Sequence, residues 1–167
     1  MATALPNGIN VAKPLIALSF ALPQSPQVRI QLQLTVLATS LLLFLTTTSP
    51  ETPSSACALG SFVYAMPNRS NPMASPLSTS LYTQANTLDF ATRLAKVLTR
   101  KVQKPVYVGN SMSFAGAGRG GDVEEEMEGF RMVVDVVMEE IRKAEEEEED
   151  DEDTSEEDDS SEEDDDE

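Results

Sequence analysis

The stretch VRIQLQLTV, residues 28–36, alternates apolar and polar side chains without interruption. A repeat of two residues is typical of a β-strand that turns one face toward a core and the other face away from it. A second apolar run follows at Leu41–Thr47, and the three residues between the runs, Ala38-Thr39-Ser40, suit a hairpin. The uncharged stretch Ile30–Pro50 is long enough to cross a bilayer, but a helix there would place its glutamines in lipid. We therefore predict paired strands here and no membrane segment.

The flanking sequence predicts further strands and two helices. Short β-prone runs lie between segments rich in Pro, Asn and Ser, which are typical of loops. Beyond the strands Val28–Leu37 and Leu41–Thr47, we expect strands at Leu15–Leu22, Ser61–Met66, Leu77–Tyr82 and Val106–Val108. Apolar residues recur at helical spacing in Thr87–Gln103 and Asp122–Lys143. The predicted fold is α+β, with a six-stranded antiparallel sheet and two helices in the order β-β-β-β-β-α-β-α.

The charge of the chain is divided unevenly. Of its 29 acidic residues, 19 fall in residues 145–167, which contain no base, whereas residues 1–144 carry 12 basic and 10 acidic residues. The net charge of −17 therefore belongs to the tail. An acidic run repels itself and has no apolar side chain to bury. We predict a disordered lead-in at residues 1–13, one α+β domain at 14–143 and a disordered polyacidic tail at 144–167.

The composition excludes several classes of catalytic site. The chain has no histidine, so serine triads and histidine-bearing zinc sites are impossible. Cys57 is the only cysteine, which excludes an intrachain disulfide and fits the cytoplasm or the nucleus. The run Gly116–Gly121 matches G-x-G-x-x-G, but no strand follows the next helix, and Glu124–Glu126 would repel a pyrophosphate. We therefore predict no catalytic residue, no cofactor and no metal site.

Two helical faces are candidate contact surfaces. Arg93, Lys96 and Arg100 fall on the side of the first helix opposite its apolar stripe. This side is either a solvated face, a contact for an acidic protein surface or a contact for phosphates, although aromatics at 5% and the absence of Trp offer little for base stacking.

The apolar arc of the second helix is wider than one contact surface needs, since Val133, Val136 and Met138 extend it. The helix is either buried deep in a single core or lies between the sheet and a second chain. In a body of this size, we favour the second chain and predict that these three residues contact a partner.

Three segments, in this order and spacing, resemble the proteasome assembly chaperone 4 family. They are PLSTSL at 76–81, ATRLAK at 91–96 and KPVYV at 104–108. Weaker likeness over Gln31–Leu45 and the final helix extends the resemblance to roughly residues 14–143. The chain departs from the short animal-type pattern at Thr48–Ser75, in the glycine-rich loop and in the acidic tail. No contact residue is transferred from the family by this resemblance.

The resemblance implies a six-stranded antiparallel sheet with two helices, which agrees with the periodicity. It also implies a non-enzymatic chaperone that pairs with proteasome assembly chaperone 3 and brings the α5 subunit into the α-ring of the 20S core particle. We expect the α-subunit contact at Arg93, Lys96 and Arg100, and no nucleic-acid or membrane partner. The alternative is a chaperone for histones or nucleic-acid proteins that acts through its acidic tail.

Overall fold

The computed structural model describes residues 15–22, 25–49, 58–114 and 123–153. The six strands and two helices occur in the predicted order. Along the chain they are β1 (Ile16–Ala21), β2 (Arg29–Val36), β3 (Leu41–Thr48), β4 (Ser61–Met66), β5 (Leu77–Tyr82), α1 (Ala85–Val102), β6 (Val106–Asn110) and α2 (Val123–Asp153). The predicted lead-in, Cys57, the glycine-rich loop and the last fourteen residues of the predicted tail lie outside the described residues.

The strands form one sheet in the order β1-β2-β3-β6-β4-β5. The prediction of a wholly antiparallel sheet is wrong at one pair, because β3 and β6 run parallel, with Leu43 opposite Val108. The other neighbouring strands are antiparallel. The chain leaves β5, passes through α1 and returns to the middle of the sheet, where β6 enters between β3 and β4. A strand that follows a helix can join the sheet parallel or antiparallel to its neighbours. The alternation of side chains shows which face of the strand is buried, but it does not show the direction of the strand.

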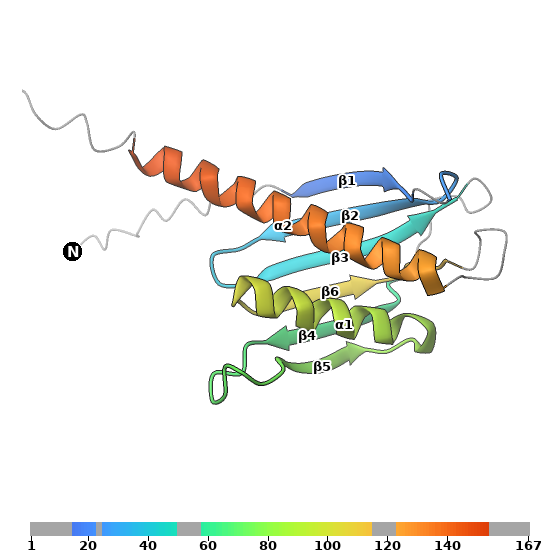
Figure 1. The fold of residues 1–167 in the computed structure, drawn as a ribbon, viewed down its shortest axis with the longest axis horizontal. Helices are drawn as coiled ribbons and strands as arrows, with labels where there is room; N and C mark the ends of the chain where they lie inside the picture. The colour runs from blue at the N-terminus through green and yellow to red at the C-terminus, as the bar shows by residue number, and fades with distance from the viewer. Residues whose placement is uncertain (1–14, 23–24, 50–57, 115–122, 154–167) are drawn as a thin grey trace, which may run out of the picture.

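Both helices cover the same face of this sheet (Figure 1). α1 packs on β4 and β6, whereas α2 lies over the β2 side. The polar–apolar alternation of β2 is confirmed, since Ile30, Leu32 and Leu34 are buried beneath the helices. The two helices contribute the other side of the core, from Phe90, Ala91, Leu94, Ala95 and Leu98 of α1 and Val133, Val134, Val137 and Ile141 of α2.

A buried polar network holds the start of α1 against the sheet. Ser61 of β4 and Thr87 of α1 share a hydrogen bond of 2.9 Å between their hydroxyls, and the backbone N–H of Ser61 donates to the Thr87 hydroxyl. Asn110 of β6 donates from Nδ2 to the Thr87 carbonyl at 3.2 Å and accepts from the backbone N–H of Met112. All three side chains are buried. Their hydrogen bonds replace those that the polar groups would otherwise make with water, so burial leaves these groups paired.

The last helix is longer than predicted. It continues to Asp153, ten residues beyond Lys143, and so includes part of the sequence assigned to the tail. Glutamate is a good helix former, and ion pairs one turn apart support the extension, with Arg142 and Glu146 at 2.7 Å. The carboxylates of Glu140 and Glu139 raise the pKa of Lys143 above its usual value. Figure 1 shows the end of α2 extending past the sheet.

Candidate protein-binding site

Four aromatic rings lie together on the face of the sheet opposite the helices. Phe44 of β3 stacks on Phe62 of β4 with ring centroids 5.9 Å apart, and Phe62 lies 6.2 Å from Tyr107 of β6. Tyr107 in turn is 4.8 Å from Tyr64 of β4. All four side chains are half-buried. In the described part of the chain both helices lie on the other side, so these rings are open to a partner. We call Phe44, Phe62, Tyr64 and Tyr107 the aromatic face.

Gly109 of β6 makes room for this stacking. It lies between Phe44 and Phe62 in the strand register. A Cβ atom at position 109 would lie 2.4 Å from Cδ1 of Phe44, much closer than van der Waals contact. The absence of a side chain therefore lets the Phe44 ring lie across β6 and reach Phe62.

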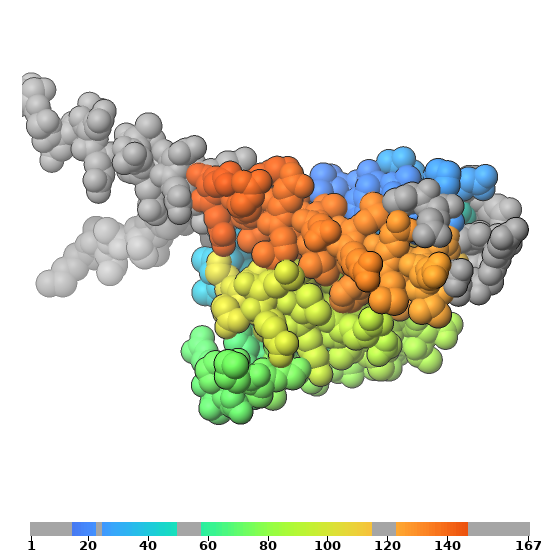
Figure 2. Space-filling model, in the orientation of Figure 1, coloured from blue at the N-terminus to red at the C-terminus, as the bar shows by residue number. Residues whose placement is uncertain are grey.

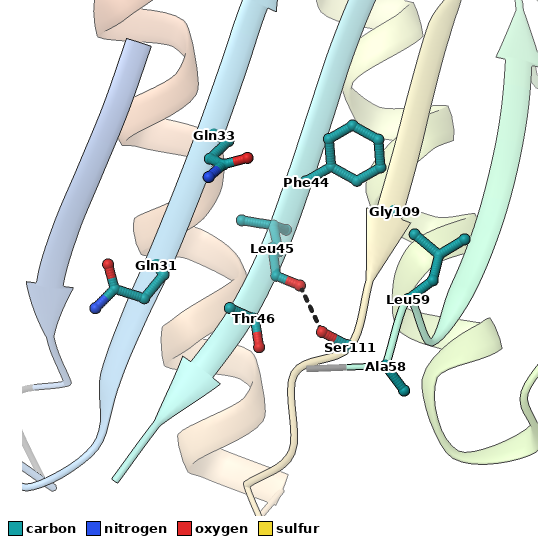
Figure 3. A pocket seen from close by; sticks show the side chains of 9 residues that line it. All are labelled: Gln31, Gln33, Phe44, Leu45, Thr46, Ala58, Leu59, Gly109 and Ser111. Carbon is teal, nitrogen blue, oxygen red and sulfur yellow. Dashed lines mark hydrogen bonds between the residues drawn. The ribbon is translucent and has the colours of Figure 1, made fainter. Parts of the chain in front are cut away.

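Next to Phe44 the face is hollowed (Figure 3). The hollow has a volume of about 250 Å³ and is lined by Gln31, Gln33, Phe44, Leu45, Thr46, Ala58, Leu59, Gly109 and Ser111. Phe44 and Leu59 form apolar walls on either side of Gly109, and Leu59 is 47% exposed. Pockets for drug-sized ligands range from roughly 300 to 1,000 Å³. The hollow is smaller, and its size suits an apolar side chain from another protein.

Apolar side chains continue from the aromatic face to the β5 edge. Met66 of β4 pairs with Leu77 of β5, and Phe62 pairs with Tyr82. Met66, Leu77 and Tyr82 are 39%, 48% and 57% exposed. Contiguous apolar surface of this kind on a folded chain marks interaction sites.

The structure places the predicted partner residues of α2 differently from expectation. Val133 is fully buried, so the prediction that it lies on an outer side of the helix is wrong. Val136 and Met138 are half-buried and pack against the core. The wide apolar arc is used within one chain, because α2 contacts both the sheet and α1, with Phe130 of α2 edge-on to Phe90 of α1 at 5.3 Å. Figure 2 shows the two helices packed side by side.

The predicted basic residues of α1 divide into two groups. Arg93 faces α2, where its guanidinium lies 3.7 Å from Glu126 and 5.3 Å from the centre of the Phe130 ring. It also pairs with Asp89 at 3.5 Å. Arg93 therefore links the helices. Lys96 is half-exposed and Arg100 is exposed, and neither forms an ion pair within the described residues, so these two remain accessible cations.

The sequence interpretation missed the aromatic face, although a signal was present. On β2 the positions turned away from the helices are polar, but on β3, β4 and β6 both faces are apolar, as in LLLFL at 41–45 and FVYA at 62–65. Loss of alternation indicates a strand with something to bury on each side. The helices of the described chain cover one side of these strands, and the aromatic face lies on the other.

The fold and this face define a class of protein, an α+β domain with helices on one side of its sheet and an apolar surface on the other. The described residues contain no group of side chains suited to a metal ion and no helix able to span a membrane. Residues 29–112, half of the chain, match the family described as proteasome assembly chaperone 4. The chain belongs to this family and is a proteasome assembly chaperone. The match runs from β2 to the end of β6 and excludes α2.

A solved structure is also similar to the chain. It is a chain in the crystal structure of a chaperone complex for yeast 20S proteasome assembly, with 15% sequence identity and a TM-score of 0.48. The similarity covers 77% of this chain and 96% of the yeast one. No curated protein sequence matches significantly.

Proposed function

We propose that the chain is a non-enzymatic chaperone that forms a heterodimer with a proteasome assembly chaperone 3-like subunit and promotes assembly of the 20S α-ring by binding an α subunit, α5. It works in the cytoplasm and also in the nucleus. The observation that supports this proposal best is the aromatic face with its adjoining hollow. These features replace Val133 as our candidate contact for the partner chaperone.

An open sheet face suits a partner with a similar sheet. Two sheets pack about 10 Å apart, with the side chains of their inner faces interdigitating. Aromatic rings dominate the energy of many protein interfaces because they bury a large area at a small entropic cost. The hollow between Phe44 and Leu59 then receives one apolar side chain of the partner.

The accessible cations lie on the other side of the molecule. Lys96 and Arg100 belong to α1, which covers the face of the sheet opposite the aromatic face. A partner chaperone on the aromatic face therefore leaves α1 free. This separation allows one chain to hold the partner chaperone and an α subunit simultaneously.

Reversing the two cations is expected to weaken α-subunit binding selectively. The double variant Lys96→Glu/Arg100→Glu should raise the Kd for the α subunit by about tenfold, since rim charges contribute to steering and complementarity. Arg131→Glu, which changes an exposed cation on α2, is the matched control and should have little effect. Binding is measured with the purified heterodimer at low and physiological salt. If the double variant and the control bind the α subunit with equal affinity, Lys96 and Arg100 do not contact it.

Deleting residues 145–167 is expected to leave both partners bound. In the deleted segment, Glu145 forms an exposed ion pair with Lys104, and Glu146 forms one with Arg142. Exposed ion pairs contribute about 0–1 kcal/mol each to stability. Affinity purification with mass spectrometry should recover the partner chaperone and α subunits, without β subunits, from both the full and the shortened chain. Recovery of histones by the full chain alone would instead favour a chaperone that acts through its acidic tail.

A further inference from the structure

The strand β5 forms an edge of the sheet, and all six of its residues are exposed. It lies beside β4 at the margin of the fold (Figure 1). Within the described residues its outer backbone groups have no hydrogen-bond partner, because no strand follows β5 in the sheet. Proteins usually protect such an edge with charges, prolines or a covering segment, since it can pair with a strand of another chain.

The surroundings of β5 lack the usual charged protection. No charged residue occurs between Arg69 and Asp89, a stretch that contains the whole strand. The opposite edge differs, because Arg29 of β2 reaches over β1 and donates to the Ser19 hydroxyl at 3.0 Å and to the Ser19 carbonyl at 3.1 Å. A cation therefore lies at the β1 edge, whereas the β5 edge is neutral.

The sequence of β5 is also symmetric. Residues 77–81 read LSTSL in both directions. Two antiparallel strands related by a two-fold axis through Thr79 would place Leu77 opposite Leu81, Ser78 opposite Ser80 and Thr79 opposite itself. A two-fold axis perpendicular to a sheet keeps each side chain on its own face, so paired residues must be an even number of positions apart or identical. This register meets that condition.

Each pair in this register is compatible. The two leucines of each strand are 48% and 55% exposed, so two Leu–Leu contacts would cover apolar area that is otherwise open. Hydroxyl pairs opposite one another can hydrogen-bond across strands, and no like charges meet. The irregularity in the β4–β5 pairing falls at Leu81, which has no partner on β4, because Tyr82 lies opposite Phe62 and Ser80 lies opposite Val63.

We propose that β5 pairs with β5 of a second copy of this chain, which joins the two six-stranded sheets edge to edge. The pairing uses the edge of the sheet and leaves the aromatic face and the accessible cations free. It therefore goes beyond the proposed heterodimer and does not depend on it.

Sedimentation velocity on the purified full chain tests this pairing. The protein should show a monomer–dimer equilibrium that moves toward the dimer as its concentration rises. Thr79→Lys places two ammonium groups opposite one another at the two-fold axis and should raise the dimer dissociation constant by about tenfold. Thr79→Glu alone should do the same, whereas an equimolar mixture of the two variants should recover the dimer.

Two further variants make the test decisive. Ala17→Lys places a cation at an exposed position of β1, the other edge strand, and should dimerise as the unmodified chain does. Leu59→Asp alters the wall of the hollow and should likewise leave this dimer intact. A chain that stays monomeric at every concentration, or a dimer lost in Leu59→Asp but kept in Thr79→Lys, would overturn the proposal.

Discussion

Replacing Phe44 by aspartate is expected to weaken binding of the partner chaperone strongly. The Phe44 ring stacks on Phe62 at 5.9 Å and forms one wall of the hollow, so it lies at the centre of the proposed interface. A carboxylate there would be desolvated by the partner without a counter-charge. Interface residues of this kind cost 2 kcal/mol or more when removed, and we expect the Kd to rise by at least about thirtyfold. Isothermal titration calorimetry with the purified partner measures the change.

Two variants control for damage to the fold. Leu59→Asp changes the opposite wall of the hollow at a side chain that is already 47% exposed, so it should weaken binding with little effect on stability. Val123→Asp introduces the same carboxylate at an apolar side chain that is 71% exposed and belongs to α2, on the other side of the sheet, so it should leave binding unchanged. If Phe44→Asp and Leu59→Asp both bind the partner with unchanged affinity, the aromatic face is not the contact.

Replacing Val133 by aspartate is expected to unfold the domain. Val133 is fully buried in the core, and an uncompensated buried charge costs about 3–5 kcal/mol. Domains of this size have about 5–15 kcal/mol of stability in total, so the loss is large. Urea denaturation followed by far-UV circular dichroism should show a much lower midpoint or no folded baseline.

The matched change on the same helix is Arg131→Asp, which falls on an exposed position and should shift the free energy of unfolding by no more than about 0.5 kcal/mol. The half-buried Val136 and Met138 should give intermediate losses when replaced by aspartate. If Val133→Asp kept the full stability of the chain but lost the partner, the partner contact would return to α2.

The strands and helices were predictable because local periodicity determines them. The alternation in β2 and the apolar stripe of α1 identified their buried residues without any knowledge of the fold. The parallel pairing of β3 with β6 was not predictable, since strand order depends on contacts between distant parts of the chain. The same limit explains Val133, because a wide apolar arc can be covered by a second chain or, as here, by the sheet and α1 together.

Part of the candidate site is visible in the sequence, but its meaning depends on the arrangement of the strands in the sheet. The apolar run LLLFL in β3 shows that both faces of that strand avoid water, but only the fold shows which face the helices leave open. The role of Gly109, which is to leave room for the Phe44 ring, becomes clear only when the structure places Phe44 beside it. Arg93 belonged to a helical row of cations in the sequence, and its contact with α2 appears only when the two helices pack together.

In the proposed heterodimer, the aromatic face binds the partner chaperone and α1 stays free. Site-specific photo-crosslinking in the purified heterodimer distinguishes the two surfaces, with a benzophenone side chain placed once at Leu59 and once at Arg100. We predict that the probe at position 59 cross-links to the partner chaperone and that the probe at position 100 does not. A cross-link to the partner from position 100, with none from position 59, would contradict this arrangement of the heterodimer.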